Sequence, residues 1–128
     1  PDSLRAPAHK AANQVFYHGY WTLAPDEALL ITAKPPVCRY WNFQLNNYWL
    51  ESLDYRYHPI TVNKRSARLE PDGSFRIVVS ARDPGFGNWM DTAGHAHGTM
   101  GLRWNMAIDP PQPVCRVMSF DDLVAGRP

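Results

Sequence analysis

The chain has 128 residues, which is the size of one ordinary domain. Thirteen Lys and Arg against twelve Asp and Glu leave a formal net charge of +1, which argues against a nucleic-acid-coating protein. No apolar run approaches the roughly 18 residues needed to cross a bilayer, so we expect no membrane protein. With 12 prolines and 12% aromatic residues, the composition favours an all-β chain.

The first part of the chain predicts an arm followed by two strands. Residues 1–13 are polar, rich in Ala and contain Pro, so we expect an N-terminal arm or linker ahead of a single domain over residues 14–128. Residues 14–23 alternate in side-chain size, which predicts a strand. Residues 27–33 predict a second strand, which the following Pro-Pro pair ends.

Residues 38–49 carry the clearest strand pattern. Three large apolar side chains alternate with a tyrosine and three carboxamides. The apolar positions are Trp41, Phe43 and Leu45, and the others are Tyr40, Asn42, Gln44 and Asn46. Alternation with period two predicts that one face of this strand lies in the core and the other outside it.

The middle of the chain predicts a hairpin. A short strand is expected over residues 60–63, and two arms over 65–70 and 74–80 flank an Asp-Gly turn. In the second arm Phe75, Ile77 and Val79 face one way, whereas Arg76 and Val78 face the other.

Residues 82–98 predict a long loop, with four Gly, two Asp and two His. Loops of this length in a small domain are usually functional or lie at an interface. Residues 99–107 predict a strand with Met100, Leu102, Trp104 and Met106 on one face and Arg103 and Asn105 on the other.

The last predicted strand covers residues 114–119, and Ser119 is placed to cap a short helical turn. Seven to nine strands then predict an all-β, jelly-roll-like sandwich of two mostly antiparallel sheets, with a helical turn near the C-terminus. We expect one shared core, formed by Trp41, Phe43, Leu45, Phe75, Ile77, Val79, Leu102 and Trp104.

Several strings resemble the bacterial domain-of-unknown-function 1214 family, over residues 14–120. They are Tyr40-Trp41-Asn42-Phe43-Gln44-Leu45-Asn46-Asn47, Glu51-Ser52-Leu53-Asp54-Tyr55-Arg56-Tyr57, Arg82-Asp83-Pro84-Gly85, Asn88-Trp89-Met90-Asp91-Thr92-Ala93-Gly94-His95 and the Arg103-Trp104 strand. The resemblance implies a jelly-roll β-sandwich that usually stands C-terminal in a longer protein, often beside a domain of unknown function 1254. It brings no established catalytic residues.

The polar side of the predicted sheet is the main candidate site. Its candidate ligand-binding residues are Asn42, Gln44, Asn46, Arg103 and Asn105. Carboxamides and Arg are costly to bury without partners, so this face meets water, a polar ligand or another domain. Tyr20, Tyr40 and Trp49 offer flat stacking surfaces near it, which suits sugars or aromatic acids.

The alternative is an enzyme domain with an acid/base or metal site in the 82–98 loop. Its candidate catalytic residues are Arg82, Asp91, His95 and Glu51. His95 and His97 have the spacing of a metal-ligand pair, with Asp91 or Glu51 as a third ligand, yet residues 98–104 contain no acid. We therefore expect no metal and no cofactor, and a network of Arg and carboxylates that pins the 82–98 loop beside residues 46–57.

The sequence thus predicts an uncharacterised jelly-roll module that binds a small polar ligand or docks a neighbouring N-terminal domain through its polar sheet face. We expect no nucleic-acid or membrane partner, and the oligomeric state is left open. No charged-then-apolar leader precedes the first strand, and the cytoplasm is the favoured compartment.

Overall fold

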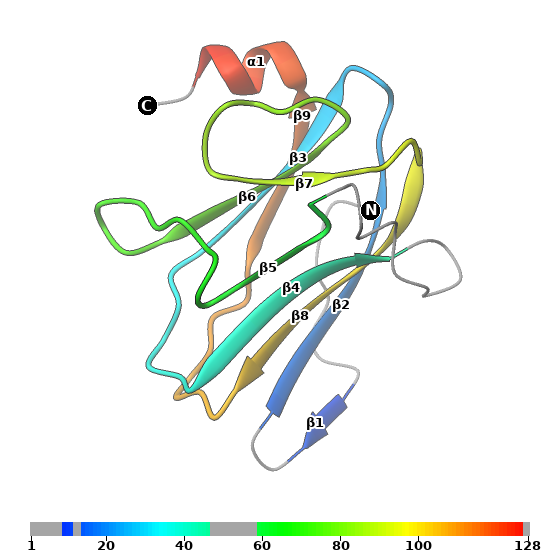
Figure 1. The fold of residues 1–128 in the computed structure, drawn as a ribbon. Helices are drawn as coiled ribbons and strands as arrows, with labels where there is room; N and C mark the ends of the chain where they lie inside the picture. Colours follow the sequence, from blue (N-terminus) through cyan, green and yellow to red (C-terminus); the bar gives the residue numbers. More distant parts are fainter. Residues whose placement is uncertain (1–8, 12–13, 47–58, 127–128) are drawn as a thin grey trace.

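Two β-sheets face each other in the structure, a computed structural model that describes residues 9–11, 14–46 and 59–126. One sheet has the strand order β1-β2-β8-β4-β5 and the other β7-β6-β3-β9 (Figure 1). The strands of the first sheet are β1 (His9–Ala11), β2 (Gln14–Thr22), β8 (His97–Asn105), β4 (Tyr40–Asn46) and β5 (Thr61–Asn63). Those of the second are β7 (Asn88–Asp91), β6 (Phe75–Ser80), β3 (Glu27–Ala33) and β9 (Val114–Ser119). The chain is a β-sandwich, as the composition and the strand patterns predicted.

Alternation along each central strand explains why the sheets stack. In β4 half-buried and buried residues alternate, so that Trp41, Phe43 and Leu45 lie in the core. Register then aligns these positions with β8, where Phe43 lies opposite Leu102 and Trp41 opposite Trp104. A slip of one residue would turn every one of these side chains to the outer face, so the pattern fixes the pairing.

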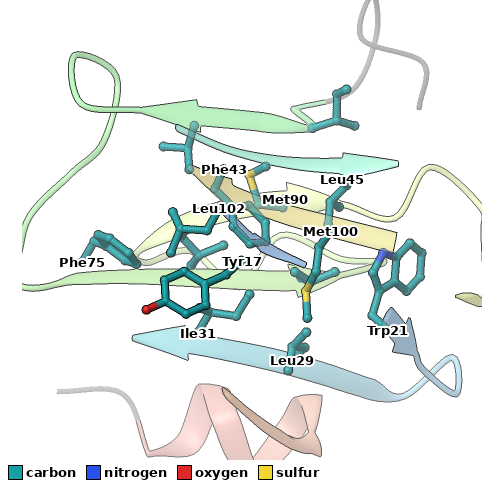
Figure 2. Packing of buried hydrophobic residues seen from close by; sticks show 14 of the residues in the cluster. Tyr17, Trp21, Leu29, Ile31, Phe43, Leu45, Phe75, Met90, Met100 and Leu102 are labelled. Carbon is teal, nitrogen blue, oxygen red and sulfur yellow. The ribbon is translucent and has the colours of Figure 1, made fainter. Parts of the chain in front are cut away.

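All eight side chains of the predicted core belong to one buried cluster. Figure 2 shows Phe43 and Met100 of the five-stranded sheet directed toward Leu29 and Ile31 of the other sheet. The rings of Trp41 and Phe75 stack across the interface, with centroids 4.7 Å apart. Aromatic packing between the sheets therefore holds the sandwich together.

The predicted loop over residues 82–98 is wrong in part. Residues 88–91 form β7, which pairs in parallel with β6, and β8 already begins at His97. Two glycines with positive φ, Gly85 and Gly87, bend the short connection 81–87 that leads back to the sheet edge (Figure 1). In a sequence, a strand of four residues between glycines is hard to distinguish from a loop, because too few residues alternate to show a period of two.

Three smaller expectations also differ. Residues 65–70 form no strand arm, because only Leu69 bridges to Phe75 before the turn. Met106, expected on the same strand face as Trp104, is 47% exposed, since its φ of 55° turns the chain out of β8. Within the predicted N-terminal arm, residues 9–11 form β1 and pair with β2.

The Asp-Gly turn forms as predicted. Gly73 has a φ of 88°, and its amide donates to the Glu70 carbonyl oxygen at 2.8 Å. The Ser74 hydroxyl donates to Asp72 Oδ1 at 2.6 Å, and this bond holds the pKa of the Asp72 carboxyl below its usual value. The turn thus places β6 for pairing with β3.

The C-terminal helix α1 (Phe120–Ala125) lies on the outer side of the four-stranded sheet. Phe120 and Leu123 are buried in a small second cluster with Ala28 and Val78. This cover explains why Val78 is fully buried although it faces away from the main core. Among the described residues, no helix is long and apolar enough to cross a membrane.

Replacing Ser119 by Ala should cost about 1 kcal/mol of folding free energy. The Ser119 hydroxyl accepts a hydrogen bond from the Asp122 amide at 3.0 Å, which caps α1. Thermal unfolding should show a melting temperature about 4 °C lower, and Ser119→Asp, which keeps an acceptor, should restore most of it. Equal loss in both variants would mean that the cap does not hold the helix.

Candidate functional site

The five-stranded sheet carries a continuous outward row of polar and aromatic side chains, here called the polar face. It consists of Gln14, Phe16, His18, Tyr20, Tyr40, Asn42, Gln44, Asn46, Thr61, Asn63, Thr99, Arg103 and Asn105. The strand register places them in rows across the sheet, here called rungs, because paired residues of neighbouring strands point to the same side. All five predicted ligand-binding residues are brought together on this face.

Arg103 occupies the middle rung of the polar face. It pairs with Phe16 of β2 on one side and with Asn42 of β4 on the other, and Asn42 pairs in turn with Asn63. The Arg103 guanidinium carbon lies 5.2 Å from the centre of the Phe16 ring. Its charge is exposed, and it is the one full charge among the residues of this face. An anionic group is the partner that this rung would accept.

Aromatic surface lies beside the arginine. The rings of Phe16 and His18 stack with centroids 4.3 Å apart and an angle of 24° between their planes. Gly101 makes room for them, because a Cβ at that position would stand 2.8 Å from the Phe16 ring. Tyr20, 66% exposed, extends the aromatic surface along β2.

The carboxamides are partly organised within the face. Gln44 Nε2 donates to Asn46 Oδ1 at 2.9 Å, which fixes the rotamer of both side chains. The Asn63 carboxamide oxygen instead accepts the amides of Arg65 and Ser66 in the turn after β5. Asn42 stands between this turn and Arg103.

Sequence reasoning missed Phe16 and His18 as part of this face. The signal was present, since both alternate with the buried residues of β2. It was overlooked because an apolar residue such as Phe16 is ordinarily expected in the core. The outward position of Phe16 becomes clear only from the pairing of β2 with β8, where a glycine lies opposite His18. Trp49, the third predicted stacking residue, lies outside the described residues.

Arg82, a candidate of the alternative enzyme site, is engaged by the C-terminal helix. Its guanidinium carbon lies 4.1 Å from the centre of the Phe120 ring, and its Nη2 lies 3.7 Å from Asp121 Oδ1. Both side chains of this ion pair are well exposed, so solvent screens it. The contacts of Arg82 therefore support the attachment of α1 to the sandwich.

Asp91 ends β7, and His95 lies in the turn between β7 and β8. Asp91 Oδ1 accepts the Ala93 amide at 2.8 Å, and the His95 amide donates to the Thr92 carbonyl oxygen at 2.9 Å. His95 is exposed and lines a cavity of about 190 Å³ whose other walls, apart from Glu27 and Thr92, are mostly apolar. The geometry offers His95 a concave setting.

Glu51, the fourth candidate, lies outside the described residues, as do Asp54 and Arg56. The predicted approach of residues 82–98 to residues 46–57 therefore stays a prediction. Pro59, which is described, does contact the end of β7, since the Asp91 amide donates to the Pro59 carbonyl oxygen at 2.8 Å. Within the described ranges, no three His, Cys, Asp or Glu side chains are grouped to hold a metal ion.

Two residues of the string from Asn88 to His95 make hydrogen bonds that support the fold. Asn88 accepts the Arg68 amide at 2.7 Å and donates to the carbonyl oxygens of Arg68 and Arg76 at 3.0 and 2.9 Å. Trp89 Nε1 donates to the Ser80 carbonyl oxygen at 3.0 Å. These bonds hold β7 against β6 and against the turn after β5.

One end of the sandwich is apolar. Of the six large hydrophobic side chains described as exposed, five lie at the end where β3 and β8 finish and β4, β6 and β9 begin. They are Val37, Leu69, Met106, Ile108 and Val114. The Ile108 amide donates to the Val37 carbonyl oxygen at 3.0 Å, which joins two of the loops there.

No protein-family model matches the sequence, and no curated protein is similar to it. Two solved structures are similar in fold. An uncharacterised protein from Burkholderia cenocepacia is 44% identical with a TM-score of 0.89, over 94% of this chain and 36% of that chain. The VPA0106 protein from Vibrio parahaemolyticus is 14% identical with a TM-score of 0.67, over 84% of this chain and 31% of that chain. This chain thus spans about a third of either protein.

Proposed function

We propose that the chain is a β-sandwich binding module whose polar face takes up a small polar ligand with an anionic group. The observation that carries this proposal is the Arg103 rung. An exposed guanidinium lies between an aromatic ring and a carboxamide, and no Asp or Glu belongs to the polar face as described. In this arrangement Arg103 pairs with a carboxylate or phosphate, Asn42 donates a hydrogen bond, and Phe16 with His18 supports a flat ring.

Benzoate is a suitable probe, because it combines a carboxylate with a flat ring. We expect it to bind the 128-residue chain with a Kd of about 1 mM in calorimetry. Arg103→Ala should weaken binding about tenfold, since a hydrogen bond to a charged group is lost. Arg68→Ala is the matched control, because it removes an exposed arginine that belongs neither to the polar face nor to β9.

The neutral analogue benzamide should bind more weakly than benzoate. The proposal fails if benzoate does not bind, or if both arginine variants lose affinity equally. Equal loss would mean that benzoate responds to the total charge of the protein rather than to the Arg103 rung.

Docking of a neighbouring domain is the second candidate function. It is favoured by the length of the similar solved chains, about three times that of the matched segment. If the polar face docks a domain, the positions equivalent to Asn42 and Arg103 in the Burkholderia cenocepacia protein are covered by the rest of that chain. If the face is a ligand site, they are open to solvent.

Membership of the domain-of-unknown-function 1214 family and a jelly-roll connection of the strands belong to this proposal. They rest on the resemblance of the Asn88 to His95 string and of the β4 sequence. The cytoplasm stays the expected compartment, and a catalytic use of His95 stays an alternative that its cavity leaves open.

A further inference from the structure

A groove of about 410 Å³ lies on the outer side of the four-stranded sheet, beside α1. Strands β3, β6 and β9 supply its floor and the end of α1 one of its walls. Its lining residues are Leu30, Thr32, Arg76, Phe86, Arg116, Met118, Asp122, Leu123 and Gly126. It lies on the opposite sheet from the polar face, so the two surfaces are separate.

The apolar part of the groove is formed by hydrophobic side chains that α1 covers only in part. Leu30, Phe86 and Met118 are only half-buried, and they pack against the small cluster beneath α1. The six-residue helix is too short to cover all three. Their remaining apolar surface would be removed from water by an apolar ligand, which is favourable.

The charged part lies at the end of the groove away from α1. Arg76 pairs in register with Thr32, and Arg116 pairs with Leu30 on the other side of β3. Their strands are about 10 Å apart, so the two long side chains flank β3. Arg76 Nε is 3.7 Å from Glu70 Oε1. The Arg116 side chain is exposed.

Asp122 makes the two ends of the groove differ in charge. It lies on α1 at the other end, one turn before Gly126, whose amide donates to the Asp122 carbonyl oxygen. Its carboxylate repels an anion there, whereas Arg76 and Arg116 attract one beside Thr32. An anionic head and an apolar body would therefore lie in one orientation only.

We propose that this groove binds an amphiphilic carboxylate, a flexible apolar chain that ends in a carboxyl group. The carboxylate lies over Thr32 between Arg116 and Arg76. The apolar body runs over Leu30 and Met118 toward Leu123.

Sodium octanoate is the probe, used with the intact chain below its micelle concentration. We expect saturable binding with a Kd of about 1 mM, and Arg116→Ala should weaken it about tenfold. Arg68→Ala, which removes an exposed arginine outside the groove and the polar face, is the matched control and should leave octanoate binding unchanged. Arg103→Ala tests whether octanoate binds the polar face instead. The neutral 1-octanol should bind at least about tenfold more weakly than octanoate.

Leu30→Asp provides a second test, because it places a carboxylate in the apolar floor and should abolish octanoate binding. Circular dichroism checks that this variant is folded, and Met118→Asp replaces it if it is not. The proposal is overturned if octanoate does not bind, if 1-octanol binds equally well, or if Arg103→Ala rather than Arg116→Ala lowers the affinity. The last outcome would assign octanoate to the polar face and leave the proposed function standing.

Discussion

Replacing Gly98 by Ala should destabilise the protein by about 3 kcal/mol. A Cβ at Gly98 would stand 2.4 Å from the Asn46 carbonyl oxygen and 2.7 Å from the Trp21 ring. Both neighbours are held in place, because Asn46 pairs with Thr99 of β8 and Trp21 is 1% exposed. The Trp21 indole also donates to the Thr99 carbonyl oxygen at 3.0 Å. Overpacking must therefore separate β8 from β4 or displace the tryptophan.

Chemical denaturation measures this loss, with Gly94→Ala as the matched control. Gly94 has a φ of 83°, but nothing lies within 4 Å of an added Cβ. Its substitution should cost only the backbone strain of a left-handed residue, about 1 kcal/mol. If Gly94→Ala proved the more damaging of the two, the close approach of β8, Trp21 and β4 would be contradicted.

Replacing Asn88 by Ala should also cost about 3 kcal/mol, because three hydrogen bonds of about 1 kcal/mol each are lost. The side chain is 8% exposed, so water does not readily replace it. The groups left behind are the amide and carbonyl oxygen of Arg68 and the carbonyl oxygen of Arg76. Thermal unfolding should show a melting temperature about 12 °C lower.

Asn63→Ala is the control for Asn88. Asn63 Oδ1 also accepts two backbone amides, from Arg65 and Ser66, but these bonds are exposed to solvent. Its loss should cost about 1 kcal/mol, since water can take over both amides. Similar melting temperatures for the two variants would show that Asn88 does not join β7 to its neighbours.

Sequence alone predicted most of the fold, for a physical reason visible in β4. Its alternation of Trp41, Phe43 and Leu45 with polar residues has no helical counterpart, and the structure buries all three. β7 escaped prediction because its four residues lie between glycines that predict a loop. Its parallel pairing with β6 depends on tertiary contacts of Asn88 and Trp89, which no local pattern encodes.

The candidate site was predicted in part. Period two placed Asn42 and Arg103 on outward faces, and register then set them side by side. Phe16 and His18 were missed because an apolar residue outside the core is recognised only when its neighbouring strand is known. The groove beside α1 had no signal at all, since Arg76 and Arg116 lie 40 positions apart in sequence and meet only through β3.

The central claim is that the Arg103 rung of the polar face binds an anionic ligand. Amide chemical shifts of the ¹⁵N-labelled chain, recorded during a benzoate titration, test it most directly. We predict that the largest shifts fall on Phe16, Asn42 and Arg103 and disappear in Arg103→Ala. Shifts that are absent, or that centre on β3 and β9 of the other sheet, would contradict the claim.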